Sequence, residues 1–288
     1  MKRLALFAAL LAYALSVAAR DPQNNFRFSI VGDRTGSPQP QVYGRVWREV
    51  DLLHPDFVIN AGDVIEGGDD AQAESQWRSV KAVWQRYSYP LFFTPGNHDI
   101  WSARSAAVYE KMTGRPPQYS FNYGDAHFVV LDNSRREALS AAQLEFLAKD
   151  LENNRERSPK FVFFHNPTVW LVPLKFQNYD FPLHALARKY GVTAVISGHT
   201  HQFARMEHDG IVYLTLPSSG GHLRGSDFAQ GWFYGHVLAT VKGSHVWFTV
   251  KEIDGPLGKG RLFGAGSWGE NGPKFDAGDP AIAEKPAT

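Results

Sequence analysis

The sequence contains no cysteine among its 288 residues. This absence excludes disulfide-linked folds, thiolate zinc sites, a cysteine nucleophile and a lipid anchored on a cysteine after a signal sequence. Any bound metal must therefore use oxygen and nitrogen ligands from Asp, Glu, Asn and His. A large net charge is also missing. The formal net charge is +1, so there is no basic field that would predict binding to nucleic acid or to an acidic membrane surface.

The apolar run near the start of the chain is too short for a stable transmembrane helix. It extends from Leu4 to Val17, follows Lys2 and Arg3, and ends in small residues. A positive start, an apolar middle and a small-residue end are typical of a secretory signal. We expect cleavage after Ala19, export to the periplasm or the exterior, and no stable membrane anchor afterwards. An uncleaved membrane anchor is the alternative.

The composition is that of a globular protein, with 43% hydrophobic and 14% aromatic residues. This is enough apolar bulk for one large core that buries two sheets. We see no linker, so we expect a signal peptide at 1–19, one domain at 20–263, and a tail at 264–288. The tail is rich in Gly, Pro, Ala and Lys, and we expect it to be disordered or loosely draped.

Strand and helix patterns alternate in the first third of the chain. Phe26 to Val31, Phe57 to Ile59 and Leu91 to Thr94 are short apolar runs, and helical spacing appears at 41–54 and 71–87. This alternation predicts a parallel sheet with right-handed crossovers. The later pattern predicts helices at 102–112 and after Ser140, a hairpin at 120–131, strands at 161–164, 192–196, 211–216, 232–241 and 246–253, and a loop at 166–181. We expect the last three strands to form a second, mostly antiparallel sheet.

Five of the predicted strands end in polar residues of one chemical kind. Ligands bind at the carboxyl ends of strands in open α/β sheets, so these residues predict a common site. Carboxylate, amide and imidazole groups suit Zn, Mn or Fe. Two such ions about 3.5–4 Å apart stabilise both oxygens of an in-line displacement, which suits phosphate esters. The residues are Asp33, Asp63, Asn97 with His98, His165, and His199 with His201.

The order Gly-Asp, Gly-Asp, Gly-Asn-His-Asp, Val-x-x-His and Gly-His-x-His resembles the calcineurin-like metallophosphoesterases. This superfamily includes purple acid phosphatases and cyclic-nucleotide phosphodiesterases. The resemblance extends over residues 26–253. It implies an α/β (α+β) fold, a four-layer αββα sandwich with two mixed β-sheets and a dinuclear metal site at the carboxyl ends of the strands.

The resemblance also implies a role for each motif residue. Asp63 would bridge the two ions, a bridging hydroxide would attack phosphorus in line, and His98 would protonate the leaving oxygen or bind the phosphoryl group. Asp33 and His201 would hold the first ion, and Asn97, His165 and His199 the second.

The chain departs from the family pattern at Thr35, where many members have a histidine ligand. Glu66, three residues after Asp63, is expected either to complete the shell of the first ion or to orient His98; a plain loop carboxylate is the alternative. We expect Asp99 to orient a ligand or His98. Arg34 either neutralises a phosphate oxygen or points away from the site.

These features predict an exported metal-dependent phosphoesterase that acts on a small-molecule phosphate monoester or diester with the help of two metal ions. Two other functions remain open. One is a binding protein with this fold whose chemistry has decayed, which the missing histidine at Thr35 favours. The other is a protein phosphatase, which differs only in its substrate.

Overall fold

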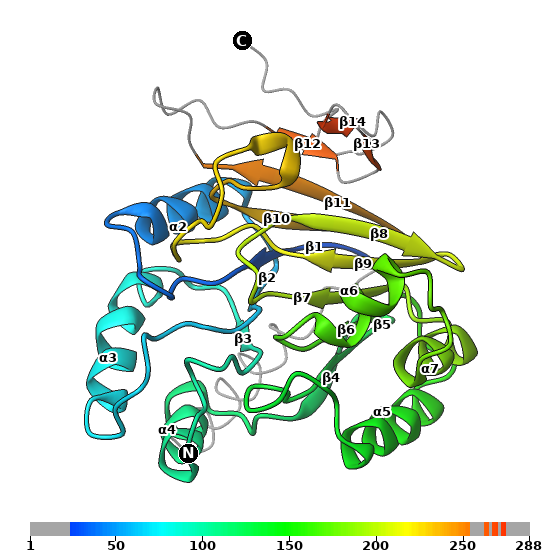
Figure 1. The fold of residues 1–288 in the computed structure, drawn as a ribbon, viewed down its shortest axis with the longest axis horizontal. Helices are drawn as coiled ribbons and strands as arrows, with labels where there is room; N and C mark the ends of the chain where they lie inside the picture. Colours follow the sequence, from blue (N-terminus) through cyan, green and yellow to red (C-terminus); the bar gives the residue numbers. More distant parts are fainter. Residues whose placement is uncertain (1–23, 254–261, 265–266, 270–271, 275–288) are drawn as a thin grey trace, which may run out of the picture.

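The computed structural model describes residues 24–253 and three short strands between residues 262 and 274. Two six-stranded β-sheets pack face to face, and helices cover the outer face of each sheet (Figure 1). This four-layer αββα sandwich with two mixed sheets confirms the predicted fold class. In the described part of the chain, no helix has both the length and the apolar character needed to cross a bilayer. The predicted signal peptide lies outside the described residues.

The first sheet has the order β12-β11-β10-β1-β2-β3. Strands β1, β2 and β3 are parallel, as the sequence predicts, and β10 pairs with β1 in the antiparallel sense. Val31, Val58 and Phe93 of this sheet pack against valine, tryptophan and tyrosine side chains of three helices. The strands are β1 (Asn25–Val31), β2 (Phe57–Asn60), β3 (Leu91–Phe93), β10 (Gly235–Lys242), β11 (His245–Glu252) and β12 (Leu262–Gly264), and the helices are α2 (Val42–Leu53), α3 (Ala73–Trp84) and α4 (Ala103–Thr113).

The second sheet has the order β4-β5-β6-β7-β9-β8. Its centre is parallel, and each edge is an antiparallel hairpin. The hairpin β4–β5 confirms the one predicted at 120–131. The strands are β4 (Tyr119–Tyr123), β5 (Ala126–Val130), β6 (Lys160–Phe163), β7 (Ala194–Ser197), β8 (Ala204–His208) and β9 (Ile211–Thr215), and the helices α5 (Ala141–Asn153), α6 (Thr168–Lys175) and α7 (Pro182–Tyr190) pack on the outer face.

A cluster of phenylalanine rings joins the two sheets. The rings of Phe28 and Phe57 in the first sheet stack at 5.1 Å, and Phe28 meets Phe128 of the second sheet edge to face at 5.3 Å. Phe128 in turn stacks on Phe161 at 4.9 Å. Full burial of one such ring contributes about 1.5–3 kcal/mol, and each contact between the sheets also fixes their relative position. The strand ends of both sheets are therefore held at one edge of the sandwich.

The C-terminal strands differ from the prediction of a separate antiparallel sheet. Strand β9 joins the second sheet parallel to β7, whereas β10 and β11 extend the first sheet beyond β1. The reason is that β10 is buried along almost its whole length. A strand buried on both faces takes a central position in a sheet that already exists.

The segment after β6 contains helix α6 where we expected a loop, and α7 follows it. Helix α6 contains Pro173 and has no clear amphipathic pattern, which explains why it was missed. Helix α7 has recognisable end signals, Pro182 in its first turn and Gly191 with a φ of 64° at its C-terminus. Strand β8 was missed because its residues are partly exposed at a sheet edge.

Two local expectations concern a helix start and the tail. The Ser140 side chain accepts a hydrogen bond from the N–H of Gln143, as a capping residue should. The Gln143 side chain does not return the bond but donates to the Asp132 carbonyl.

In the predicted tail, the structure describes the short antiparallel strands β13 (Ser267–Gly269) and β14 (Gly272–Lys274). The other tail residues lie outside the described part.

Candidate metal centre

The carboxyl ends of strands from both sheets meet at one edge of the sandwich. Asp63 follows β2 of the first sheet, and His165 and His199 follow β6 and β7 of the second sheet. Each of these three residues offers one ligand atom, and the three atoms lie within 4.8 Å of one another. The structure thus brings together residues that are far apart in the sequence but were predicted to share one site.

The two aspartates are buried and lie beside the same imidazole. Asp33 is fully buried, and both of its carboxylate oxygens accept the N–H of His199, at 2.9 and 3.0 Å. Asp63 Oδ1 accepts the N–H of His98 at 2.9 Å. The Nε2 atom of His165 lies 3.1 Å from Asp63 Oδ2 and 3.6 Å from Asp33 Oδ1. Both carboxylates therefore lie close to the imidazole ring of His165.

Two histidine rings are oriented by backbone carbonyls. His165 Nδ1 lies 2.9 Å from the Ala61 carbonyl, and His201 Nδ1 lies 2.6 Å from the His222 carbonyl. A carbonyl only accepts hydrogen bonds, so each Nδ1 carries a proton, and Nε2 is the ring atom that remains to bind a metal ion. This is the usual arrangement of histidines that bind metal ions. His222 takes part in this contact through its backbone carbonyl.

Two buried polar atoms of the predicted ligands have no hydrogen-bond partner. They are His165 Nε2 and Asn97 Oδ1. An orphaned buried polar atom costs about 1–3 kcal/mol, which a coordinated cation would offset. All the converging atoms are imidazole nitrogens or carboxylate and amide oxygens. The residues present therefore fit divalent metal ions such as Zn, Mn or Fe.

The backbone of three predicted ligands is strained. Asp63, His199 and His201 have φ values of 55°, 69° and 57°, in the left-handed region that residues other than glycine rarely adopt. Such strain costs of order 1–3 kcal/mol per residue and is concentrated at functional sites. The surrounding fold must hold these ligands in place before any ion binds.

Glycines of the motifs allow close approach to the carboxylates. A Cβ atom at Gly96 would lie 2.2 Å from Asp63 Oδ1, and one at Gly198 would lie 2.9 Å from Asp33 Oδ2. Distances this short exclude a side chain unless the aspartate moves, and at Gly96 the Asp63 backbone nitrogen, at 2.3 Å, would have to move as well. The glycine before Asn97 and the glycine before His199 are thus required by the packing of the site.

The electrostatics of the site favour a bound cation. Burial lowers the pKa of His165, but the carboxylates of Asp63 and Asp33 outweigh burial and raise the pKa well above 6.5. Burial raises the pKa of Asp63, and the imidazoles of His165 and His98 outweigh it and lower the pKa. A proton on His165 partly neutralises the two carboxylates, and a metal ion would replace that proton.

Glu66 orients His98, but through its backbone. The Glu66 carbonyl lies 2.6 Å from His98 Nδ1, which leaves His98 Nε2 free. The exposed Glu66 carboxylate instead accepts hydrogen bonds from the Thr35 hydroxyl and from the N–H of Ser37, the latter at 3.3 Å. The carboxylate makes no contact with the His98 ring, and its contacts are those of the loop carboxylate that we gave as the alternative.

Asp99 and Arg34 hold loops together instead of pointing at the ligands. The Asp99 carboxylate accepts the N–H groups of Val64 at 2.8 Å, Ile65 at 3.2 Å and Gly96 at 3.0 Å. It therefore ties the loop after β2 to the loop after β3, and none of these bonds is to the ring of His98.

The Arg34 guanidinium donates to the Val64 carbonyl at 3.1 Å and lies 5.9 Å from the ring centre of Tyr43. These contacts agree with the alternative in which Arg34 points away. These contacts of Asp99 and Arg34 are thus with the backbone of neighbouring loops and with Tyr43.

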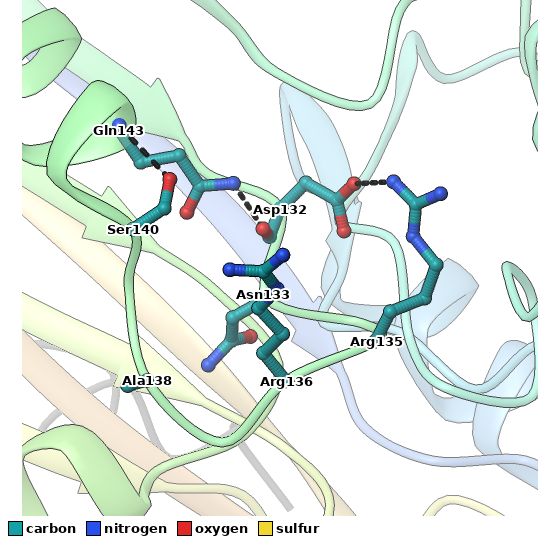
Figure 2. A pocket seen from close by; sticks show the side chains of 7 residues that line it. All are labelled: Asp132, Asn133, Arg135, Arg136, Ala138, Ser140 and Gln143. Atoms are coloured by element: carbon teal, nitrogen blue, oxygen red, sulfur yellow. Dashed lines mark hydrogen bonds and ion pairs between the residues drawn. The ribbon is translucent and has the colours of Figure 1, made fainter.

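A polar cavity of about 510 Å³ lies beside the loop after β5 and was not predicted from the sequence. Asn133, at the end of β5, connects the cavity to the site: its Oδ1 accepts the backbone N–H of His165 at 3.1 Å, and Asn133 also lines the cavity. Arg135 and Arg136 extend from the same loop among the lining residues, and Arg135 lies 3.6 Å from Asp132 (Figure 2). The arginine pair in the loop that follows a buried strand was the available sequence signal.

Comparison with known proteins identifies the fold and its family. The family model of calcineurin-like phosphoesterases matches residues 26–203. A 3',5'-cyclic-nucleotide phosphodiesterase of Nostoc is 26% identical over 185 residues, which are 60% of this chain and 67% of that protein. Purple acid phosphatase 15 of Arabidopsis thaliana is 26% identical over 54% of this chain and 29% of that protein. The purple acid phosphatase from yellow lupin seeds has a similar structure, with a TM-score of 0.62, at 16% identity, over 79% of this chain and 51% of that one.

Proposed function

Because this chain belongs to the calcineurin-like phosphoesterase family, a family of phosphate-ester hydrolases that use divalent metal ions, usually two, we propose that it is an exported enzyme for small phosphate esters. The observation that supports this most directly is the pair of orphaned buried ligand atoms, His165 Nε2 and Asn97 Oδ1, beside two buried carboxylates.

Each residue of the centre has a proposed part in holding two ions. Asp63, His165 and His199 offer ligand atoms that lie close together, and Asp63 would bind both ions. Asp33 and His201 would hold one ion, and Asn97, His165 and His199 would hold the other. When bound, the ions neutralise the charge of the phosphoryl oxygens and acidify water at the site.

His98 is the proposed general acid. Its Nδ1 is held 2.6 Å from the Glu66 carbonyl, so the proton that it delivers is on Nε2. His98 is half-buried, and its backbone N–H donates a hydrogen bond to Asp63 Oδ1. The ring therefore lies next to a proposed ligand and is accessible to substrate. From this position Nε2 protonates the leaving oxygen or, in its other proposed role, donates to the phosphoryl group.

We propose phosphodiesters as the first substrate class to test, with monoesters second. The Nostoc relative is named a cyclic-nucleotide phosphodiesterase, and a diester has a second substituent that needs room. The cavity of about 510 Å³ beside the loop after β5 offers that room, and Arg135 and Arg136 suit a polar or anionic substituent.

Export rests on the signal-like residues 1–19, which lie outside the described residues. N-terminal sequencing of the protein secreted by its host cell tests this proposal. An amino terminus at Arg20 supports export with cleavage. Met1 on the mature protein contradicts it.

Elemental analysis together with a substrate panel tests the function. Purified protein should contain about two divalent ions per chain, and chelation should abolish hydrolysis of bis(p-nitrophenyl) phosphate and p-nitrophenyl phosphate. Nucleotide and phosphopeptide substrates assayed side by side distinguish the protein-phosphatase alternative. One ion or none, with no turnover of any ester after metal reconstitution, would show instead a binding protein with decayed chemistry.

A further inference from the structure

A second group of metal-ligating side chains lies at the opposite end of the second sheet. It consists of His184 on α7, His208 at the end of β8 and Asp209 in the turn that follows, and we call it the edge cluster. Strand β8 starts three residues after His201 of the metal centre and extends for about 16 Å. The edge cluster is therefore separate from the metal centre described above.

The first observation is a buried nitrogen without a partner. His184 is 3% exposed, and its Nδ1 lies 2.7 Å from the hydroxyl of Tyr213. Its Nε2 is buried and makes no hydrogen bond, although Asp209 Oδ2 lies 3.4 Å away. The Tyr213 hydroxyl can donate to Nδ1 or accept from it. In the tautomer with the proton on Nδ1, Nε2 presents a lone pair to the Asp209 carboxylate, and a cation between the two satisfies both groups.

The second observation is that the other two ligands are held beside this nitrogen. Asp209 and Gly210, with φ values of 51° and 74°, form the two-residue turn between β8 and β9. The ring of His208 stacks on Tyr179 at 3.7 Å, and its Nε2 lies 3.8 Å from Asp209 Oδ1. One ligand atom from each residue lies within 4.8 Å of the others.

We propose that the edge cluster binds a divalent transition-metal ion, with Zn²⁺ as the best match, through His184, His208 and Asp209. Two imidazoles and one carboxylate form a set that zinc accepts with water in the fourth position, whereas Mg²⁺ and Ca²⁺ prefer oxygen ligands alone. A tetrahedral zinc shell places its ligand atoms about 3.3 Å apart, so the cluster contracts by about an ångström when it binds the ion.

Arg188 competes with the ion for the cluster. Its guanidinium lies 3.3 Å from Asp209 Oδ2, and the side chain is 68% exposed. The guanidinium supplies positive charge in place of the metal, and because it is exposed it moves into solvent at little cost. The ion enters through an open cavity of about 710 Å³ lined by His184 and Arg188. Once bound, it fastens the exposed edge hairpin β8–β9 to α7.

Equilibrium dialysis of the full chain at about 10 µM free zinc tests the proposal. The wild-type chain should bind one zinc equivalent more than Asp209→Asn and than His208→Gln, whereas the matched control His245→Gln, an exposed histidine on β11, should equal the wild type. Arg188→Ala should bind zinc more tightly than the wild type, because it removes the competing cation.

Phosphoesterase activity should be the same in all these variants, so this test is independent of the function proposed above. Anomalous scattering at the zinc edge should show a peak between the three side chains in wild-type crystals. Equal zinc content in the wild type, Asp209→Asn and His208→Gln, or the absence of that peak, overturns the proposal.

Discussion

The metal centre and the edge cluster use the same ligand chemistry but are held by the chain in different ways. The ligands of the centre come from the strand ends of both sheets, with strained backbone at Asp63, His199 and His201. In the edge cluster only His184 is buried, and the exposed guanidinium of Arg188 forms an ion pair with the Asp209 carboxylate. The centre is organised in advance, as catalysis requires, whereas the edge cluster must rearrange to bind. Position in the fold, more than residue type, separates a catalytic site from an accessory one.

Asp63→Asn should have the largest effect, because the substitution removes the charge of the residue proposed to bridge the ions. We expect kcat/KM to fall by at least about 1,000-fold, or about 4 kcal/mol of transition-state stabilisation. Steady-state kinetics on an aryl phosphodiester measure this. The same change in the other cluster, Asp209→Asn, should leave kcat/KM unchanged. Comparable losses in both variants would remove the distinction between the two sites.

Gly96→Ala should lower turnover by about 100-fold. The new Cβ would lie 2.2 Å from Asp63 Oδ1, so the carboxylate must move, and displacement of a catalytic group by an ångström costs a factor of this size. Gly210→Ala beside the edge cluster is the control. Its Cβ meets nothing within 4 Å, but its φ is 74°, so it should cost about 1 kcal/mol of stability and no activity. Kinetics and urea unfolding of both variants give the answer, and full activity of Gly96→Ala would contradict the packing argument.

His236 is a buried histidine whose pKa is not raised by a nearby carboxylate. Burial, together with the smaller effect of the Lys251 charge, lowers the pKa of His236 to about 3. Neither ring nitrogen makes a hydrogen bond. Because the folded-state pKa is below the ordinary value of 6.5, the unfolded chain takes up the proton first as the pH falls. The stabilisation is therefore complete above about pH 6.5 and is lost progressively towards pH 3.

His236→Leu should remove this acid sensitivity. Between pH 7.5 and pH 5, the free energy of unfolding of the wild type should fall by about 2 kcal/mol more than that of the variant. Urea titrations at the two pH values measure the difference. An equal fall in both proteins would mean that His236 finds a partner for its proton.

Glu66→Gln should have the smallest effect, a change of less than about threefold in kcat/KM. The reason is that His98 is held by the Glu66 carbonyl, which the substitution retains, while the carboxylate contacts Thr35 and Ser37. Metal analysis should find the same ion content as in the wild type. Loss of an ion would show that the carboxylate is a metal ligand after all.

The parts of the site that could be predicted are those determined by short stretches of sequence. Asp33, Asp63, Asn97, His165 and His199 each follow an apolar strand directly, so the strand pattern predicts where they meet. Glu66 could not be assigned in this way, because nothing in the sequence distinguishes a contact by its carboxylate from one by its carbonyl. That difference depends on the path of the loop after β2.

The fold shows the same limit. The sandwich and its parallel strands follow from local periodicity and from the family motifs. The division of β9, β10 and β11 between two sheets depends on which edge is free when they pack, and this is a property of the whole molecule. The edge cluster was missed for a related reason. His184 and Asp209 belong to a helix and a turn that are adjacent only because α7 packs beside the β8–β9 hairpin.

The pairing of Asp33 with His199 has a consequence for when the protein acquires its metal. The two residues are 166 positions apart in the sequence and are held by different sheets. The complete set of ligands therefore exists only after both sheets have closed on the phenylalanine cluster. A chain that is still unfolded offers only scattered single ligands, which bind ions weakly. We therefore expect the chain to acquire its ions where the last sheet closes, from the metals available there.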